Sequence, residues 1–167
     1  MNLMDEVHVS VLMCTYKYSL FLERAIVSID KQTHKNIELI LVVNCIGNID
    51  YKKIYTFCSK YKFIKIYRTR ICQLSYNLNF GMDKCSSNYI LRLDDDDICY
   101  SNRITKLLKF MLLHDLDVIG SNADYIDEGG KIIGSSSHLE FDNERIKRSL
   151  MYKNPIIHPS VLFNKKS

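Results

Sequence analysis

Four consecutive aspartates at positions 94–97 are the side chains of this sequence whose type and spacing point most directly to chemistry. They follow an apolar run at residues 89–93, which predicts a buried strand. Unit charges roughly 4 Å apart repel by about 4 kcal/mol near a protein surface, so the cluster favours a neutralising cation. Carboxylates are ligands that Mg²⁺ and Mn²⁺ prefer, and Mg²⁺ usually completes its shell with water and substrate phosphates. The aspartates therefore predict a divalent metal that carries a diphosphate.

Two interpretations of the aspartates remain open from the residues alone. If the segment stays extended, Asp94 and Asp96 point to the same side and face one ligand. In the alternative, Asp97 or a neighbour caps the next helix and the others form a solvated acidic turn. The position at the end of a predicted strand favours the metal. Neither a P-loop nor a G-x-G-x-x-G after the first strand occurs, so the common alternative phosphate sites are disfavoured.

The elements that must position these aspartates alternate along the chain. Continuous apolar runs predict buried strands at residues 7–14, 37–44, 63–67 and 89–93. Segments with helical spacing lie between them, and Ser19 is expected to cap the first. The third helix is expected to bury one face, made of Leu74, Leu78, Met82 and Cys85. This alternation implies right-handed crossovers and an α/β fold with a mostly parallel central sheet flanked by helices.

Weaker signals follow the aspartates. In chain order they predict a helix beginning near Ser101, a strand at 117–121, a β-hairpin around Gly129 and Gly130, a helix capped by Asp142, and an apolar segment at 161–163. Ligands of such sheets bind beyond the carboxyl ends of the strands. That rule selects residues 14–17, 44–45 and 94–97 as the candidate site.

Composition bounds the class of protein. The 167 residues fit a single domain spanning 1–167, and 47% hydrophobic with 25% charged residues is ordinary for a globular protein. The net charge of +4 comes from scattered cations, so nucleic acid is not expected as a partner. No run approaches the roughly 20 apolar residues of a membrane span, and no secretory signal opens the chain. The six cysteines lack C-x-x-C spacing, so they are expected to be reduced in a cytoplasmic domain.

Four segments of the chain carry a resemblance to one known family. V-S-V-L-M-C-T-Y at 9–16 is similar to an opening V-S-V-I-M-P-T-Y strand, and residues 28–40 resemble S-I-x-x-Q-T-x-x-N-x-E-I-I. Residues 78–98 resemble A-L-N-x-G followed by Y-I-A-R-M-D-A-D-D-I. N-P-I-I-H-P-S-V at 154–161 resembles a block of bacterial transferases that make O-antigen, capsule and other exopolysaccharides. Together the segments resemble glycosyltransferase family 2, which has the GT-A (Rossmann-like) nucleotide-sugar fold.

The resemblance implies a metal-dependent, inverting glycosyltransferase. A sugar would move from a nucleoside diphosphate, preferably a UDP-sugar, to a saccharide or lipid-linked acceptor in surface polysaccharide biosynthesis. Mn²⁺ or Mg²⁺ would be bound by Asp96 and Asp94, with Asp94 or Asp95 near the ribose. Thr15 and Tyr16 match the turn that holds the nucleobase and ribose. The expected location is the cytoplasm, with at most peripheral contact at the inner face of the membrane.

Several positions leave alternatives open. Arg92 either reaches the diphosphate or pairs with the acidic run, and pairing is the favoured interpretation. Asn44 stands where the family commonly has a carboxylate that reads the nucleobase; it keeps hydrogen-bonding capacity without the charge. His158 is a weak candidate for a catalytic base, and a structural, hydrogen-bonded or acceptor-orienting role is favoured. Asp124 and Asp127, near the hairpin, are further candidates, with solvated loop charges as the favoured interpretation.

Inverting transfer also needs a general base to take the proton of the acceptor. The family places this Asp or Glu after the H-P-S-V block, and no acidic residue follows Glu144 in this sequence, which ends at Ser167. The resemblance therefore implies a catalytic base beyond Ser167, and one donor-binding domain that lacks the C-terminal acceptor and base region. The alternative is a truncated, non-catalytic module that binds nucleotide-sugar or metal without turnover.

Overall fold

The computed structural model describes residues 6–136 and 143–166. Its strands are β1 (Val9–Thr15), β2 (Ile37–Asn44), β3 (Ile64–Thr69), β4 (Tyr89–Arg92), β5 (Val118–Ile119), β6 (Asp124–Ile126), β7 (Ile132–Ser135) and β8 (Leu162–Asn164). Its helices are α2 (Leu20–Asp30), α3 (Asn48–Cys58), α4 (Leu74–Lys84), α5 (Arg103–Leu113) and α6 (Asn143–Ser149), with a 3₁₀ turn η1 (His158–Ser160). None of the helices within these ranges is long and apolar enough to cross a bilayer.

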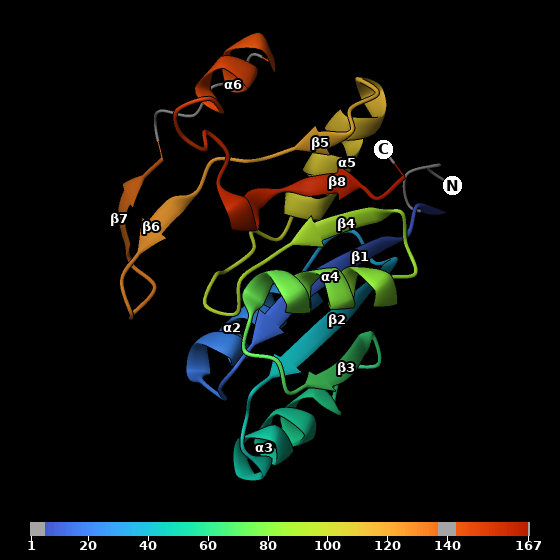
Figure 1. The fold of residues 1–167 in the computed structure, drawn as a ribbon, viewed down its shortest axis with the longest axis vertical. Helices are drawn as coiled ribbons and strands as arrows, with labels where there is room; N and C mark the ends of the chain where they lie inside the picture. Colours follow the sequence, from blue (N-terminus) through green and yellow to red (C-terminus); the bar gives the residue numbers. More distant parts are fainter. Residues whose placement is uncertain (1–5, 137–142, 167) are drawn as a thin grey trace.

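The central sheet has the strand order β3-β2-β1-β4-β8-β5, and β6 pairs with β7 as a separate hairpin (Figure 1). β1 pairs in parallel with β2 and β4, and β2 pairs in parallel with β3. β8 is antiparallel to its neighbours β4 and β5. The predicted α/β fold with a mostly parallel sheet is confirmed. The carboxyl ends of β1, β2 and β4 share one edge, where ligands of such sheets bind.

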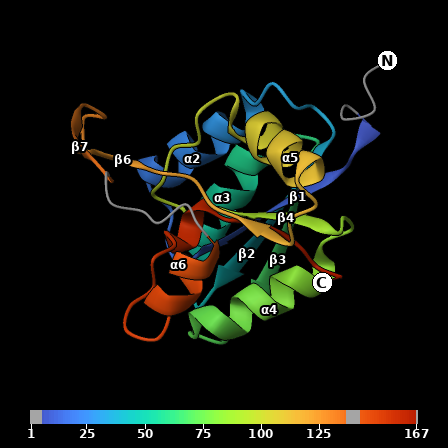
Figure 2. The same ribbon diagram turned by 90° about the horizontal axis from the view of Figure 1, so that it is seen from above.

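Helices cover both faces of the central sheet, as Figure 2 shows with α4 on one side and α2, α3 and α5 on the other. Every residue of β1 is buried. Because alternate side chains of a strand point to opposite faces, Val11 and Met13 join the core beneath α2 and α5, whereas Leu12 and Cys14 pack toward α4. Burial on both faces holds β1 firmly and so fixes the position of Thr15 at its end.

α4 contacts the sheet through three of its four predicted residues and through two residues that were not predicted. A Cβ atom at Gly81 would lie 2.8 Å from Val42 Cγ2, so the helix approaches closely only because this residue is glycine. Asn77 is also buried, and its amide donates hydrogen bonds to two backbone carbonyls of the preceding loop. Leu78, Met82 and Cys85 pack against the sheet as predicted, but Leu74 is 51% exposed. The prediction counted apolar residues only, so it missed that Gly81 and Asn77 also belong to the buried face.

Local turn and cap signals are mostly confirmed. Ser19 Oγ accepts a hydrogen bond from the Leu22 amide at 3.1 Å and caps α2. The hairpin of β6 and β7 forms as predicted, with Gly130 at φ 87° in its turn. The predicted cap at Asp142 lies outside the described residues. Short-range signals therefore locate these elements well.

The cysteines depart from the prediction of a fully reduced chain. Cys45, directly after β2, forms a disulfide with Cys72 in the loop before α4, with the Cα atoms 5.5 Å apart. The free cysteines are buried as small apolar side chains: Cys14, Cys58, Cys85 and Cys99. The paired residues are 27 positions apart, and only the fold brings their two loops together at the carboxyl edge of the sheet.

Candidate functional site

The acidic turn, residues 94–97, lies beside the end of β1. Because β4 is parallel to β1, the chain leaves both strands at the same edge of the sheet. Thr15 Oγ1 lies 2.6 Å from Asp95 Oδ2 and donates a hydrogen bond to it. The Leu93 amide donates to the Leu12 carbonyl at 3.2 Å, which extends the pairing of the two strands into the turn. Two segments 80 residues apart in sequence are thereby joined at one point.

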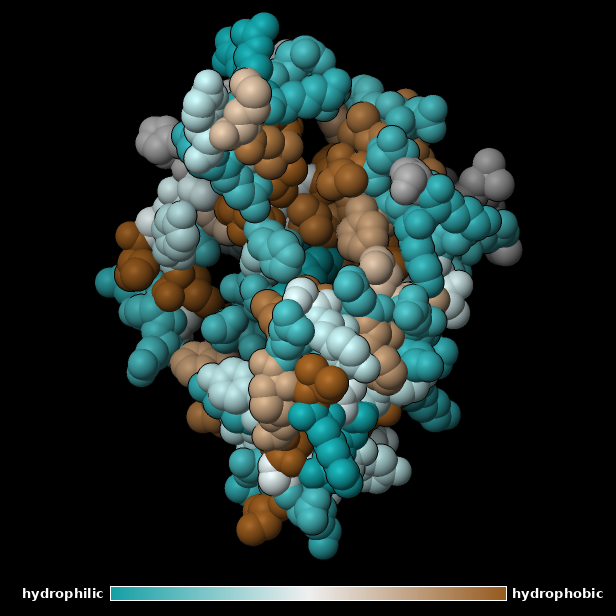
Figure 3. Space-filling model, in the orientation of Figure 1, coloured by the Kyte–Doolittle hydropathy of each residue, from teal (hydrophilic) through white to brown (hydrophobic). Residues whose placement is uncertain are grey.

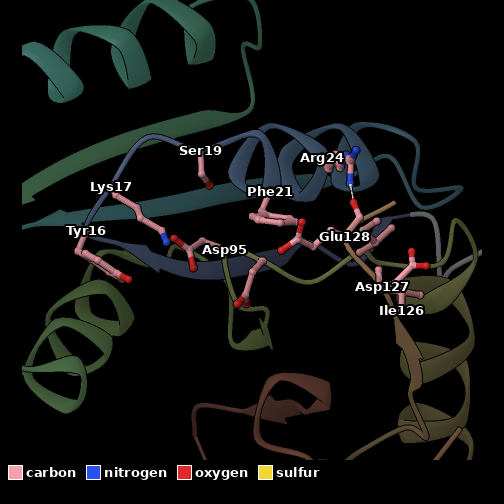
Figure 4. Close-up of a pocket in the computed structure, with 11 residues that line it drawn as sticks. Tyr16, Lys17, Ser19, Phe21, Arg24, Asp95, Ile126, Asp127 and Glu128 are labelled. Atoms are coloured by element: carbon pink, nitrogen blue, oxygen red, sulfur yellow. Dashed lines mark hydrogen bonds between the residues drawn. The ribbon is translucent and has the colours of Figure 1, made fainter. Parts of the chain in front are cut away.

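A cavity of about 320 Å³ opens at this junction. It is lined by the turn after β1, the start of α2, the acidic turn and the tip of the β6–β7 hairpin, as Figure 4 shows. The lining residues are Tyr16, Lys17, Ser19, Phe21, Arg24, Asp95, Asp96, Ile98, Ile126, Asp127 and Glu128. Its volume falls at the lower end of the range of roughly 300–1,000 Å³ typical of small-molecule sites. Carboxylates, cations and aromatic rings all face the same space.

The carboxylates of the acidic turn have different surroundings. Asp94 Oδ1 accepts a hydrogen bond from Nη2 of the buried Arg92, so Arg92 pairs with the acidic run. The backbone turns at Asp95 and Asp96, and the Asp97 amide donates to the Asp94 carbonyl at 3.3 Å. The extended geometry expected for Asp94 and Asp96 is therefore wrong. Asp95 and Asp96 are the two aspartates of the turn that line the cavity.

The alternative in which Asp97 caps the next helix is also wrong. α5 begins at Arg103, slightly later than the predicted start near Ser101, and its N-cap position is Asn102, whose side chain makes no capping hydrogen bond. Arg103 Nη2 instead donates to the Pro159 carbonyl at 2.8 Å. The acidic turn therefore does not cap α5, although the charge of Arg103 partly opposes the rise in the pKa of Asp97.

Charge is crowded in the acidic turn. Burial raises the pKa of Asp95, and repulsion from Asp96 and Asp94 adds to it, while the Thr15 hydrogen bond opposes the rise. Burial and then repulsion from Asp94 and Asp96 raise the pKa of Asp97 to about 6. Both shifts mean that the folded protein disfavours the ionised carboxylates. A cation held at the turn would relieve this repulsion.

The donor set fits a divalent metal that shares its shell with a ligand. Within the described residues, no group of three or more His, Cys, Asp and Glu side chains is arranged to hold a metal ion. Asp95 and Asp96 offer carboxylate oxygens at the cavity wall. Mg²⁺ is usually bound by one or two protein carboxylates together with water and substrate phosphates, and such a site needs no complete protein cage.

Two other predicted residues flank the cavity differently. Tyr16 lines it, and Lys17 Nζ lies 5.4 Å from the centre of the Tyr16 ring. Asn44 ends β2 at the same edge of the sheet but is not among the lining residues. The next residue, Cys45, has φ 51° and is tied to Cys72. The disulfide therefore constrains the backbone next to Asn44.

His158 opens η1 and is exposed. No hydrogen bond of its side chain is found among the described residues, and its structural or acceptor-orienting role stays a prediction. Ser160 is the anchored residue of this block: it is buried, and its Oγ accepts a hydrogen bond from the Ser121 amide at 3.2 Å. The Arg92 amide donates to the Val161 carbonyl at 2.9 Å, so the block supports β4 just before the acidic turn.

Inverting transfer also needs a general base, which is expected outside the acidic turn. The sequence predicts this base beyond Ser167, and Ser167 itself lies outside the described residues. The weaker candidate, His158, is not among the residues that line the cavity. The location of the base beyond Ser167 therefore stays a prediction.

The hairpin residues divide between a structural and a cavity-lining role. Asp124 accepts hydrogen bonds from Tyr100 Oη at 2.5 Å and Ser135 Oγ at 2.6 Å, which attach the hairpin to the loop after the acidic turn. Asp127 is exposed, as expected for a solvated loop charge, and also lines the cavity. Its Oδ1 also accepts a hydrogen bond from the Lys131 amide at 2.9 Å and so shapes the turn.

Sequence reasoning missed the contact that closes this side of the cavity. Arg24, on α2, donates from Nη1 to the Glu128 carbonyl at 2.7 Å, and the dashed line in Figure 4 marks this bond. The polar position of Arg24 on an amphipathic helix indicates only that it faces away from the core. Its partner lies 104 residues further along the chain, which no local pattern reveals.

Comparison with known proteins places this site within a family. The sequence model of Glycosyl transferase family 2 matches residues 10–167. The O-antigen biosynthesis glycosyltransferase WbnJ of Escherichia coli is 34% identical over 161 residues, which cover 94% of this chain and 61% of WbnJ. The amylovoran biosynthesis glycosyltransferase AmsE of Erwinia amylovora is 30% identical over 147 residues, covering 86% of this chain and 54% of AmsE. The chain thus spans about three-fifths or less of these two relatives.

Solved structures share the fold at low sequence identity. The S. aureus TarS 1-349 structure in complex with UDP-GlcNAc has a TM-score of 0.73 and 16% identity, over 95% of this chain and 46% of that chain. The mannosyltransferase PcManGT from Pyrobaculum calidifontis, in complex with GDP-Man and Mn²⁺, has a TM-score of 0.62 and 12% identity, over 70% and 36%. The architecture is GT-A-like, as the motifs predict. The family match over nearly the whole chain, together with these relatives, shows that the chain belongs to glycosyltransferase family 2.

Proposed function

We propose that the cavity binds a nucleoside-diphosphate sugar, a UDP-sugar by preference, together with Mn²⁺ or Mg²⁺. The observation that carries this proposal is the hydrogen bond between Thr15 and Asp95, which places the turn after β1 and two cavity-lining carboxylates around one space. TarS has been crystallised with UDP-GlcNAc and with UDP, and PcManGT with GDP-Man and Mn²⁺. Those ligands are consistent with a nucleotide-sugar at this edge of the sheet.

The residues have separate roles in this proposal. Asp96 holds the metal, with Asp95 beside it, and the bound ion offsets negative charge that develops on the leaving diphosphate. Thr15 fixes the orientation of Asp95 through the 2.6 Å hydrogen bond. Arg92 engages Asp94 and draws that carboxylate away from the cavity. Tyr16, which lines the cavity, offers a ring face to the nucleobase or ribose.

The proposed reaction is transfer of the sugar, with inversion, to a saccharide or lipid-linked acceptor in surface polysaccharide biosynthesis. The similarity to WbnJ and AmsE, which are O-antigen and amylovoran biosynthesis glycosyltransferases, supports this process. We take residues 1–167 as one donor-binding domain of that enzyme. We expect it in the cytoplasm, where nucleotide-sugars are available, with peripheral contact at the inner face of the membrane.

A thermal-shift measurement tests donor binding. UDP with Mn²⁺ is expected to raise the melting temperature of the native chain, and Asp96→Asn is expected to remove most of this rise. Asp83→Asn is the matched control, because Asp83 is an exposed carboxylate on α4, away from the cavity-lining residues. A native chain that no nucleoside diphosphate stabilises would contradict the proposal, as would an Asp96→Asn variant that responds like the control.

Asn44 favours a second candidate function, a module that binds nucleotide-sugar without turnover. An amide stands where the family commonly has a carboxylate that binds the nucleobase. Asn44 can still form hydrogen bonds with a base, but without the negative charge it is expected to bind the base less tightly. An assay of donor hydrolysis and transfer separates the two functions. Binding with release of the sugar supports the transferase, and binding without any turnover supports the module.

A further inference from the structure

A short basic and apolar segment is exposed beyond the hairpin. It consists of residues 143–153, which include α6, and is called the α6 segment below. α6 buries none of its residues. Directly after it, three consecutive large side chains are exposed: Leu150 by 55%, Met151 by 69% and Tyr152 by 87%. Large apolar side chains are seldom exposed in an unbroken run, so this surface needs a partner.

The backbone of the α6 segment is folded, so the exposure belongs to a shaped surface. The Leu150 amide donates to the Ile146 carbonyl at 3.0 Å, and the Tyr152 amide donates to the Ser149 carbonyl at 3.0 Å. These hydrogen bonds continue the helical turn through the apolar residues. The three side chains therefore stand on a turn that presents them outward.

The same segment is basic. Four cations, Arg145, Lys147, Arg148 and Lys153, stand against one anion, Glu144, which gives a net charge of +3 within eleven residues. Lys147 pairs with Glu144 at 3.2 Å, while Arg148 and Lys153 are exposed. Residues 51–70 form a second basic stretch, with seven cations and no acidic residue. In the α6 segment the cations stand beside three consecutive exposed large side chains.

The position of the α6 segment relates it to the cavity. Figures 1 and 2 both show α6 and the β6–β7 hairpin on the side of the molecule toward which the parallel strands point. The tip of that hairpin lines the cavity. Figure 3 shows hydrophilic and hydrophobic side chains mixed at the end of the molecule where α6 lies.

We propose that the α6 segment docks the protein on an anionic lipid bilayer. Exposed apolar side chains enter the boundary between headgroups and acyl chains, and flanking Lys and Arg pair with anionic headgroups, which is how basic amphipathic segments bind membranes. Nucleic acid would match the charge but leaves the run of Leu150, Met151 and Tyr152 unexplained. Docking through the α6 segment does not depend on the donor that the cavity takes, since it uses none of the cavity-lining residues.

Vesicle co-sedimentation tests the docking surface. The native chain is expected to bind vesicles of phosphatidylcholine mixed with phosphatidylglycerol, to release them as salt rises, and to ignore pure phosphatidylcholine. Arg148→Gln with Lys153→Gln is expected to weaken binding by roughly tenfold or more. Met151→Ser with Tyr152→Ser is expected to weaken it by a similar factor, because burial of both side chains is lost.

The matched control removes two charges elsewhere. Lys106→Gln with Lys109→Gln lowers the net charge equally on exposed residues of α5 and is expected to change vesicle binding less than twofold. Absence of binding to anionic vesicles, or equal losses in the control, would overturn the proposal. Preferential binding of a nucleic-acid duplex, or a dimer in analytical ultracentrifugation that Met151→Ser with Tyr152→Ser dissolves, would assign the surface to another partner and overturn it as well.

Discussion

The two ends of the central sheet shift the pKa values of their carboxylates in opposite directions. Near the amino end, Glu38 is buried and accepts hydrogen bonds from Ser10 Oγ at 2.5 Å, the Ser86 amide at 2.7 Å and Lys65 Nζ at 2.7 Å. Burial acts to raise the pKa of Glu38, but bonds from Lys65, Ser10 and Ser86 outweigh it and hold the pKa at about 2. At the carboxyl end, the pKa of Asp97 is instead raised to about 6.

The difference lies in what surrounds each charge. Glu38 meets one cation and several donors, so the folded protein stabilises its ionised form and uses it to join β1, β2 and the turn before β4. In the acidic turn, Arg92 pairs with Asp94 and Thr15 donates to Asp95. Burial and repulsion between the carboxylates nevertheless outweigh these partners and the nearby Arg103, since the pKa values of Asp95 and Asp97 are raised. A satisfied buried charge stabilises the fold, whereas a crowded one beside a cavity is available to a ligand.

The largest expected effect is at the amino end. Glu38→Gln removes the charge that Lys65 and the serines satisfy and is expected to lower the free energy of unfolding by about 3 kcal/mol. Urea denaturation at neutral pH measures this change. Asp83→Asn, on an exposed surface, is expected to change stability by less than about 0.5 kcal/mol. A Glu38→Gln variant as stable as that control would break the contrast between the two ends.

The acid dependence of stability sharpens the same contrast. The folded-state pKa of Glu38, about 2, lies below its ordinary value of 4.5, so its contribution is complete above pH 4.5 and is lost as the pH falls toward 2. The stability difference between the native chain and Glu38→Gln should therefore narrow across this window. Urea unfolding of both proteins, measured from pH 6 to pH 2, tests this. A difference in unfolding free energy that stays constant over this range would contradict the expectation.

Thr15→Val tests the junction at the other end. Loss of the hydroxyl removes the hydrogen bond that orients Asp95 and is expected to lower the affinity for UDP with Mn²⁺ about tenfold. The free energy of unfolding is expected to fall by about 1 kcal/mol. Thr15→Ser keeps a hydroxyl and is expected to restore most of the affinity. Equal affinities for Thr15→Val and Thr15→Ser would show that the hydrogen bond to Asp95 does not shape the site.

The smallest expected effect has the opposite sign to that of Glu38→Gln. Asp97→Asn removes one of the crowded charges and is expected to raise the stability of the ligand-free chain by about 1 kcal/mol after solvent screening. Thermal unfolding without added metal measures it. A destabilised variant would mean that Asp97 is satisfied in the way that Glu38 is.

Much of the fold follows from short-range patterns. The apolar runs predict the four parallel strands, Ser19 predicts the start of α2, and Gly130 predicts the hairpin turn, because each signal acts within a few residues. The close approach of α4 to the sheet at Gly81 was missed, since it depends on side chains of two distant strands. The Cys45–Cys72 disulfide was missed for the same reason.

The candidate site was predicted only in outline. The position of the acidic run after β4 predicts that it lies beside Thr15, and the hydrogen bond to Asp95 confirms this neighbourhood. A tight turn and the pairing of Asp94 with Arg92 decide which aspartates face the cavity. The prediction assumed an extended segment, so it did not include the turn. The bond from Arg24 to the hairpin joins two elements that only the three-dimensional fold brings together.

Titration calorimetry of UDP, with and without Mn²⁺, tests the central claim most directly. If the acidic turn holds a cation that carries the diphosphate, UDP and Mn²⁺ must each strengthen the binding of the other by the same factor. We expect coupling of at least tenfold in the native chain and its loss in Asp96→Asn. UDP affinity that is the same with and without the metal, in both proteins, would contradict the account.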